Sequence, residues 1–107
     1  MELIAVVTTV STREQAQAMA RALVQQRLAA CAQISQIESL YVWDGALQQE
    51  PEFRLLFKTT DDRYAAVEEA IRKLHPYELP AIHAYGVAHV YAPYAEWVVQ
   101  NSRQSQN

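Results

Sequence analysis

Glycine is nearly absent from this chain, which excludes several common kinds of catalytic and nucleotide-binding site. Only two of the 107 residues are glycines, Gly45 and Gly86. Phosphate-binding loops use glycine so that the backbone can approach the phosphate, and two isolated glycines cannot build such a loop. The sequence also has no Gly-x-Ser-x-Gly turn and no His-Glu-x-x-His zinc motif. These absences do not favour an enzyme.

Cysteine and basic residues are also scarce. Cys31 is the one cysteine, so no internal disulfide can form, and a lone thiol is typical of a reducing compartment. The formal net charge is −3, whereas proteins that bind nucleic acids or membrane surfaces are usually basic. The first apolar run is too short for a signal or membrane segment. We therefore expect a cytoplasmic protein with no nucleic-acid or membrane partner.

What the chain has in quantity is hydrophobic residues, which make up half of it. That share and the length fit a single globular domain over residues 1–107. Apolar runs, helical stripes and capping residues predict strands at 3–9, 29–43, 46–60 and 81–89 and helices at 12–27, 61–74 and from residue 93 onward. The order β-α-β-β-α-β plus a terminal helix predicts an α+β, ferredoxin-like fold with two helices on one face of an antiparallel sheet.

Three local features refine this expectation. Ser11 and Glu14 have the spacing of a capping box at the start of the first helix. Ala30, Ala32 and Ile34 share one strand face but Ile37 has the other parity, which predicts a bulge near residues 35–36. Pro51 lacks a backbone donor, so residues 48–51 should be irregular or lie at an exposed edge.

A long hairpin organises the chain. Asp44-Gly45 separates two apolar runs and is typical of a tight turn with positive φ. Each arm has about a dozen residues, against about five or six in an average strand. Such arms exceed what a domain of this size needs, so we expect part of the hairpin to project and to pair outside its own fold. Leu40, Tyr41, Val42 and Trp43 are the predicted contact residues.

The chain offers few residues for chemistry, and a purely structural role stays open for each of them. Cys31 is a buried structural thiol or a soft metal ligand of the kind that suits Cu(I) or Zn. His75, His83 and His89 could supply nitrogen, but no pair has a chelating spacing. A metal site would therefore gather ligands from different segments or subunits.

Two other ferredoxin-like functions have candidate residues. Arg13 follows the first strand, where acyl-phosphate hydrolases hold phosphate, but the capping pattern favours a solvated residue at a helix start. Phe53 and Phe57 could imitate base-stacking aromatics of RNA-binding sheets. The acidic balance favours core packing for both.

Six motifs lie along nearly the whole chain in a fixed order. They are Arg27-Leu28-Ala29-Ala30-Cys31, Glu38-Ser39-Leu40-Tyr41-x-Trp43-x-Gly45, Glu50-x-Glu52, Lys58-Thr59-Thr60, His75-Pro76-Tyr77-x-x-Pro80 and Tyr94-x-x-Trp97. In this order and spacing the chain resembles the CutA family, named for divalent-cation tolerance. None of the motifs would be specific alone.

The resemblance implies a ferredoxin-like protomer, a homotrimer made through the long hairpins, and binding of copper or another divalent metal. It also implies an architecture like that of trimeric PII-type signalling proteins. Thr8 and Ala81 stand where some members carry a cysteine and a glutamate. Both replacements remove candidate ligands, so we expect weak metal binding.

We predict the site in the cleft between subunits, near the base of the hairpin. Cys31 and His75 are the candidate metal ligands, and Lys58, Tyr77 and Glu78 the candidate residues lining the cleft. In the alternative, purely structural interpretation, Cys31 packs in the protein interior and Lys58 pairs with a carboxylate. Pro76 and Pro80 then only stiffen a turn.

Four functions remain open at this point. The first is divalent-metal (copper) binding by a homotrimer in metal tolerance. The second is a PII-like module that binds a metabolite between subunits. The third is an unrecognised enzyme using Cys31, His75 or Lys58, and the fourth is a structural trimer that scaffolds another protein.

Overall fold

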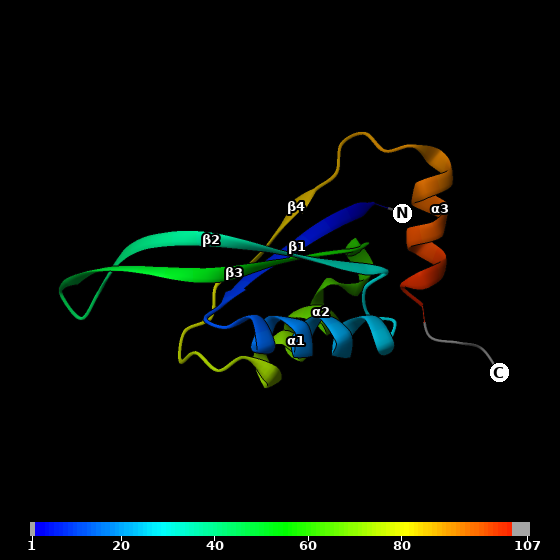
Figure 1. Cartoon of the computed structure of the whole chain (residues 1–107). Coiled ribbons are helices and arrows are strands. Elements are labelled where there is room, and N and C mark those ends of the chain that lie inside the picture. Colours follow the sequence, from blue (N-terminus) through cyan, green and yellow to red (C-terminus); the bar gives the residue numbers. More distant parts are fainter. Residues whose placement is uncertain (1, 104–107) are drawn as a thin grey trace.

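The computed structural model describes residues 2–103 and has the predicted order of elements. Four strands form one antiparallel sheet in the order β2-β3-β1-β4. Helices α1 and α2 lie on one face of the sheet, and α3 lies at the end nearest the N-terminus (Figure 1). The elements are β1 (Leu3–Val10), α1 (Arg13–Gln25), β2 (Cys31–Trp43), β3 (Ala46–Thr60), a 3-10 turn (Asp61–Arg63), α2 (Tyr64–Leu74), β4 (Ile82–Gly86) and α3 (Ala92–Asn101).

The core lies between the sheet and the first two helices. Val6 of β1 and Leu55 and Phe57 of β3 are fully buried against Leu23 of α1 and Ile71 of α2. Alternate strand residues point to one face, so one parity of β1 and of β3 forms the floor of this core. The core role predicted for Phe57 is confirmed.

Helix α1 begins one residue later than the predicted capping box implies. Thr12 is the N-cap: its hydroxyl accepts from the Gln15 backbone N–H at 3.1 Å, and the Gln15 side-chain oxygen accepts from the Thr12 N–H at 3.3 Å. The predicted pair of Ser11 and Glu14 was therefore wrong by one position. Thr and Gln satisfy the same geometry as Ser and Glu, and the sequence offers both frames.

The hairpin runs without a bulge, so that prediction was wrong. Its register is continuous from the pair Trp43–Ala46 to the pair Cys31–Lys58. Figure 1 shows β2 and β3 crossing over one another, as expected of a strongly twisted two-stranded ribbon. Because of this twist, residues on one side of β2 face inward at its start and residues on the other side face inward further along. Ile37 can therefore face inward without the extra residue of a bulge.

Other boundaries shift for local reasons. A 3-10 turn precedes α2 where the sequence predicted helix. Strand β4 ends at Gly86, three residues before the predicted end, where its partner β1 begins: Gly86 pairs with Ile4, and the Val87 N–H donates to the Leu3 carbonyl oxygen. Pro51 sits in the part of β3 that extends past β1, at an exposed edge as predicted. Trp97 of α3 is 44% exposed.

Candidate functional site

Cys31 and Lys58 face each other at the base of the hairpin, on the sheet face opposite α1 and α2. The Cys31 thiol is half-buried, 3.8 Å from the Tyr94 hydroxyl, and the Lys58 ammonium lies 5.9 Å from the centroid of the Tyr94 ring. Burial, and then the contact with Cys31, raises the pKa of Tyr94. The Lys58 ammonium donates to the Gln33 side-chain oxygen at 3.3 Å. This partner is an amide, whereas the purely structural alternative predicted a carboxylate.

His75 lies at the opposite end of β1. Its Nε2 is 2.9 Å from the Thr9 carbonyl oxygen and 3.1 Å from the Thr8 hydroxyl, and its Nδ1 accepts the Tyr77 backbone N–H at 3.1 Å. An acceptor at Nδ1 assigns the proton of the neutral ring to Nε2. Burial lowers the pKa of His75, which favours this neutral form. Both ring nitrogens are engaged, so metal binding through His75 would break one of these bonds.

Within one chain the structure does not bring Cys31 and His75 together. Lys58, opposite Cys31, pairs with Ala5, whereas Thr9, which binds His75, pairs with Arg54. Four residues of strand separate these positions, about 13 Å. The reason is topological: β4 runs antiparallel to β1, so the segment that enters β4 must lie at the C-terminal end of β1. Convergence of the two side chains between subunits stays a prediction.

Tyr77 and Glu78 do line a cavity, but with the far half of the hairpin and not with Lys58. The cavity has a volume of about 490 Å³ and lies between the hairpin and the segment at 77–81. Its lining residues come from the hairpin, from that segment and from the end of β1: Tyr41, Trp43, Glu50, Glu52, Tyr77, Glu78, Leu79, Ala81, Thr9 and Ser11.

Two tyrosine–carboxylate pairs shape this cavity. Glu52 is only 7% exposed and accepts a hydrogen bond from the Tyr77 hydroxyl at 2.6 Å. Burial, and then this bond to Glu52, raises the pKa of Tyr77 well above its usual range. Nearer the turn, the Tyr41 hydroxyl donates to Glu50, and that bond raises the pKa of Tyr41. Each phenol therefore acts as a donor that holds one carboxylate in place.

Sequence reasoning assigned no role to Glu50 and Glu52, although a signal was present. A two-residue turn at Asp44-Gly45 fixes the register of the whole hairpin, and residues two apart in a strand share a face. That register places both glutamates on the face of Tyr41 and Trp43. What the sequence could not show is that the segment at 77–81 covers this face.

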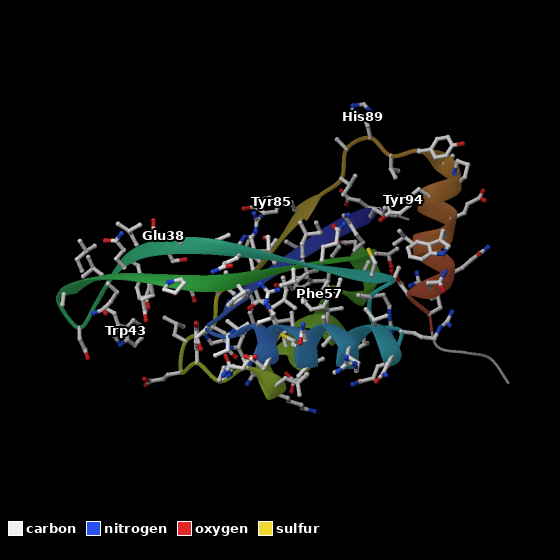
Figure 2. The ribbon with its side chains drawn as sticks, viewed as in Figure 1. Glu38, Trp43, Phe57, Tyr85, His89 and Tyr94 are labelled. Atoms are coloured by element: carbon white, nitrogen blue, oxygen red, sulfur yellow. The ribbon has the colours of Figure 1, made fainter. Side chains whose placement is uncertain are left out.

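The four predicted contact residues near the turn are all exposed, by 58% for Leu40, 39% for Tyr41, 68% for Val42 and 46% for Trp43. They do not form one surface. Tyr41 and Trp43 line the cavity, whereas Leu40 and Val42 lie on the other face of the ribbon with Leu47, which is paired with Val42 and 68% exposed. In Figure 2 the labelled Glu38 and Trp43 point to opposite sides of the hairpin.

Residues 2–103 contain no group of three or more His, Cys, Asp or Glu side chains placed to hold a metal ion. They also contain no helix that is long and apolar enough to cross a membrane. The soft thiol of Cys31 itself fits copper.

A four-stranded antiparallel sheet with two helices on one face, a projecting hairpin and a terminal helix defines a ferredoxin-like α+β protein. The family described as "CutA1 divalent ion tolerance protein" matches residues 4–101. The chain belongs to this family, as its motifs indicated. The family is named for tolerance of divalent ions and not for catalysis.

Relatives and solved structures agree with this assignment. A probable divalent-cation tolerance protein of Encephalitozoon cuniculi is 40% identical over 88% of this chain and 82% of its own length. The structure of CutA from Synechococcus elongatus is 35% identical, with a TM-score of 0.92 over 95% of this chain and 91% of its own. A protein of Archaeoglobus fulgidus described as the periplasmic divalent cation tolerance protein CutA is 26% identical, with a TM-score of 0.92 over 94% and 99% of the two chains.

Proposed function

We propose that this protein contributes to divalent-metal tolerance as a homotrimer that binds copper weakly, through ligands from more than one subunit and not as an enzyme. Membership of the tolerance family supports the role. The observation that carries the metal proposal is the state of Cys31, a half-exposed thiol whose side-chain partner among residues 2–103 is a phenol at 3.8 Å. Such a thiol can bind a soft cation without breaking a strong interaction.

The shape of the protomer supports assembly. The sheet ends in two free edges, β2 on one side and β4 on the other. Unpaired strand edges favour pairing with another chain, and pairing unlike edges head to tail closes a ring when the rotation fits. The exposed apolar face of Leu40, Val42 and Leu47 would also be covered in such a ring. We expect light scattering to give about three times the 12.2 kDa of one chain.

The metal proposal is tested by titration of Cu(I) under reducing conditions, with native mass spectrometry to count chains and ions. We expect Cys31→Ser to lower copper affinity by at least about tenfold, since a thiolate is the preferred ligand of Cu(I). His75→Ala is the second variant: a loss of affinity there would mean that assembly frees His75 to bind. His89→Ala is the control, because this side chain projects from the loop before α3, away from the sheet (Figure 2). Unchanged binding in Cys31→Ser would refute the proposal.

We also propose that the protein acts in the cytoplasm, since a lone thiol is typical of a reducing compartment. The Archaeoglobus fulgidus relative is described as periplasmic, so the two locations make different predictions. Cell fractionation with an antibody against the native protein decides between them. Recovery outside the cytoplasmic fraction would contradict the proposal.

A further inference from the structure

The cavity between the hairpin and the segment at 77–81 concentrates negative charge. Three carboxylates line it, those of Glu50, Glu52 and Glu78. Among the described residues that line it, none is Lys, Arg or His. The ring of His75 lies behind the wall, with its centroid 4.8 Å from that of Tyr77, and its two nitrogens are engaged with Thr9 and with the Tyr77 backbone. A ligand of this cavity should therefore be a cation.

Glu52 makes this argument strongest because it is both buried and incompletely compensated. A carboxylate can accept about four hydrogen bonds. Among residues 2–103 the donor to Glu52 is one neutral phenol, and the ion pairs of this part of the chain join Arg72 and Lys73 to Glu69, and Arg103 to Asp62. Burying an ionised carboxylate is costly unless opposite charge lies nearby. A cation from solution would supply that charge.

The other walls of the cavity select the kind of cation. Tyr41, Trp43 and Tyr77 present aromatic rings, and Leu79 adds an apolar side chain. Aromatic faces attract ammonium groups, and cages of this kind recognise organic ammonium ions. The volume of about 490 Å³ lies in the range of small-molecule pockets and far exceeds a single metal ion.

From these features we infer that the cavity binds a small organic ammonium ion, a ligand distinct from the tolerated metal. The charged head lies between Glu50 and Glu52, and the apolar body lies against Trp43 and Leu79. Tyr41 and Tyr77 hold the two carboxylates ready to receive it. This site does not include Cys31, Lys58 or Tyr94, so it can be tested independently of copper binding.

Choline and its neutral carbon isostere, the alcohol in which carbon replaces the nitrogen, are the probes. Both have the same shape, so a difference in affinity reports the charge. Trp43 lies in the cavity and Trp97 lies on α3, so the fluorescence of Trp43 is followed in a Trp97→Phe background. We expect choline to bind at least about tenfold more tightly than the alcohol. A single desolvated cation–π contact can supply an affinity difference of this size.

Matched variants locate the binding. Glu52→Gln keeps an acceptor for the Tyr77 hydroxyl but removes the charge, and we expect it to weaken choline by at least about tenfold. Glu50→Gln, at a more exposed position, gives a second reading if Glu52→Gln folds poorly. Glu38→Gln makes the same chemical change on the opposite face of the hairpin and should leave choline affinity unchanged. Cys31→Ser should also leave it unchanged.

Four results would overturn the proposal. Equal binding of choline and the alcohol would make the cavity a simple apolar pocket. Tighter binding of Cu(II) or Zn(II) that displaces choline and is lost in Glu52→Gln would make it a metal site. A Trp43 signal that ignores choline but changes on dilution would mean that a second copy of the chain fills the cavity. Absence of any response would leave no ligand site there.

Discussion

Phe57 and Leu47 belong to the same strand, but they lie in halves of the hairpin with different surroundings. From Phe53 to Lys58, β3 pairs with β1 on one side and β2 on the other, and its core face is covered by helices. From Ala46 to Glu52 it pairs with β2 alone. Phe57 is fully buried, and Leu47 is 68% exposed.

The difference separates what hydrogen bonds do from what burial does. The ladder is continuous through both halves, so backbone pairing alone does not distinguish them. An isolated two-stranded ribbon is at best marginally stable in water. The base is stabilised by its own core, whereas one face of the distal half lines a cavity with the segment at 77–81 and the end of β1. In the proposed trimer a second chain covers the other face, so the two halves should respond differently to mutation and to dilution.

The largest expected effect is at the base. Phe57→Ala removes a fully buried ring from the main core, and we expect the free energy of unfolding to fall by about 3–5 kcal/mol. Denaturant unfolding at fixed protein concentration measures it. Leu47→Ala is the comparison on the distal half, and its effect should depend on protein concentration because further burial of Leu47 would come from assembly. A fall below about 1 kcal/mol for Phe57→Ala would contradict the assigned core.

The next effect is at the exposed apolar face. Val42→Asp places a charge where we expect a subunit contact, and the lost burial of one valine is worth about 1.5–3 kcal/mol per subunit. We expect smaller species in light scattering and a melting temperature that falls with dilution. Gln49→Glu is the control, because it adds the same charge opposite Leu40 on this face without removing apolar area. If Val42→Asp assembles and melts like the parent, this face is not an interface.

How far the sequence predicted these features depends on whether a local signal decided them. The order of elements, the turn at Asp44-Gly45 and the core role of Phe57 follow from periodicity and turn chemistry, and the structure has all three. The bulge near Ser35 was wrong because twist, which a parity count ignores, moved the buried face. Sequence alone did not reveal the covering of Glu52 by Tyr77, 25 residues later in the chain.

The candidate site shows the same limit. Tyr77 and Glu78 do lie at a cavity, whereas Lys58 lies beside Cys31 at the other end of β1. The antiparallel pairing of β4 with β1 decides this separation. The predicted fold already implied this separation, because the direction of each strand determines the end of the sheet at which the next loop lies.

A smaller effect concerns pH at the junction of the two halves, where His75 joins the 77–81 segment to β1. Its pKa in the folded protein is lowered from the ordinary value of 6.5, chiefly by burial. The unfolded chain therefore binds this proton more readily. The stabilisation by neutral His75 is complete above the unfolded pKa and is lost as the pH falls through it toward the lower folded value.

Melting temperatures of the parent and of His75→Asn between pH 8 and pH 5, roughly the range in which histidine titrates, test this assignment. The parent should lose stability on acidification more steeply than the variant, and the difference isolates His75 from Glu52 and Tyr77, which lie beside it. Parallel curves would mean that the ring is not held neutral. Trp43 fluorescence shows where the loss of stability begins. If the segment at 77–81 loosens first, this fluorescence should change before global unfolding.

The smallest effect is at the turn itself. Asp44 and Gly45 have φ of 53° and 74°, the left-handed values that a tight hairpin turn needs. A Cβ at Gly45 would meet no atom within 4 Å, so Gly45→Ala costs only backbone strain, about 1 kcal/mol. Asp44→Asn is the control, because Asn also tolerates these angles. If the distal half is stabilised only within a trimer, Gly45→Ala should lower the melting temperature of the assembled protein but leave that of a dissociated Val42→Asp background unchanged. An equal loss in both backgrounds would show that the distal half folds as part of the protomer core.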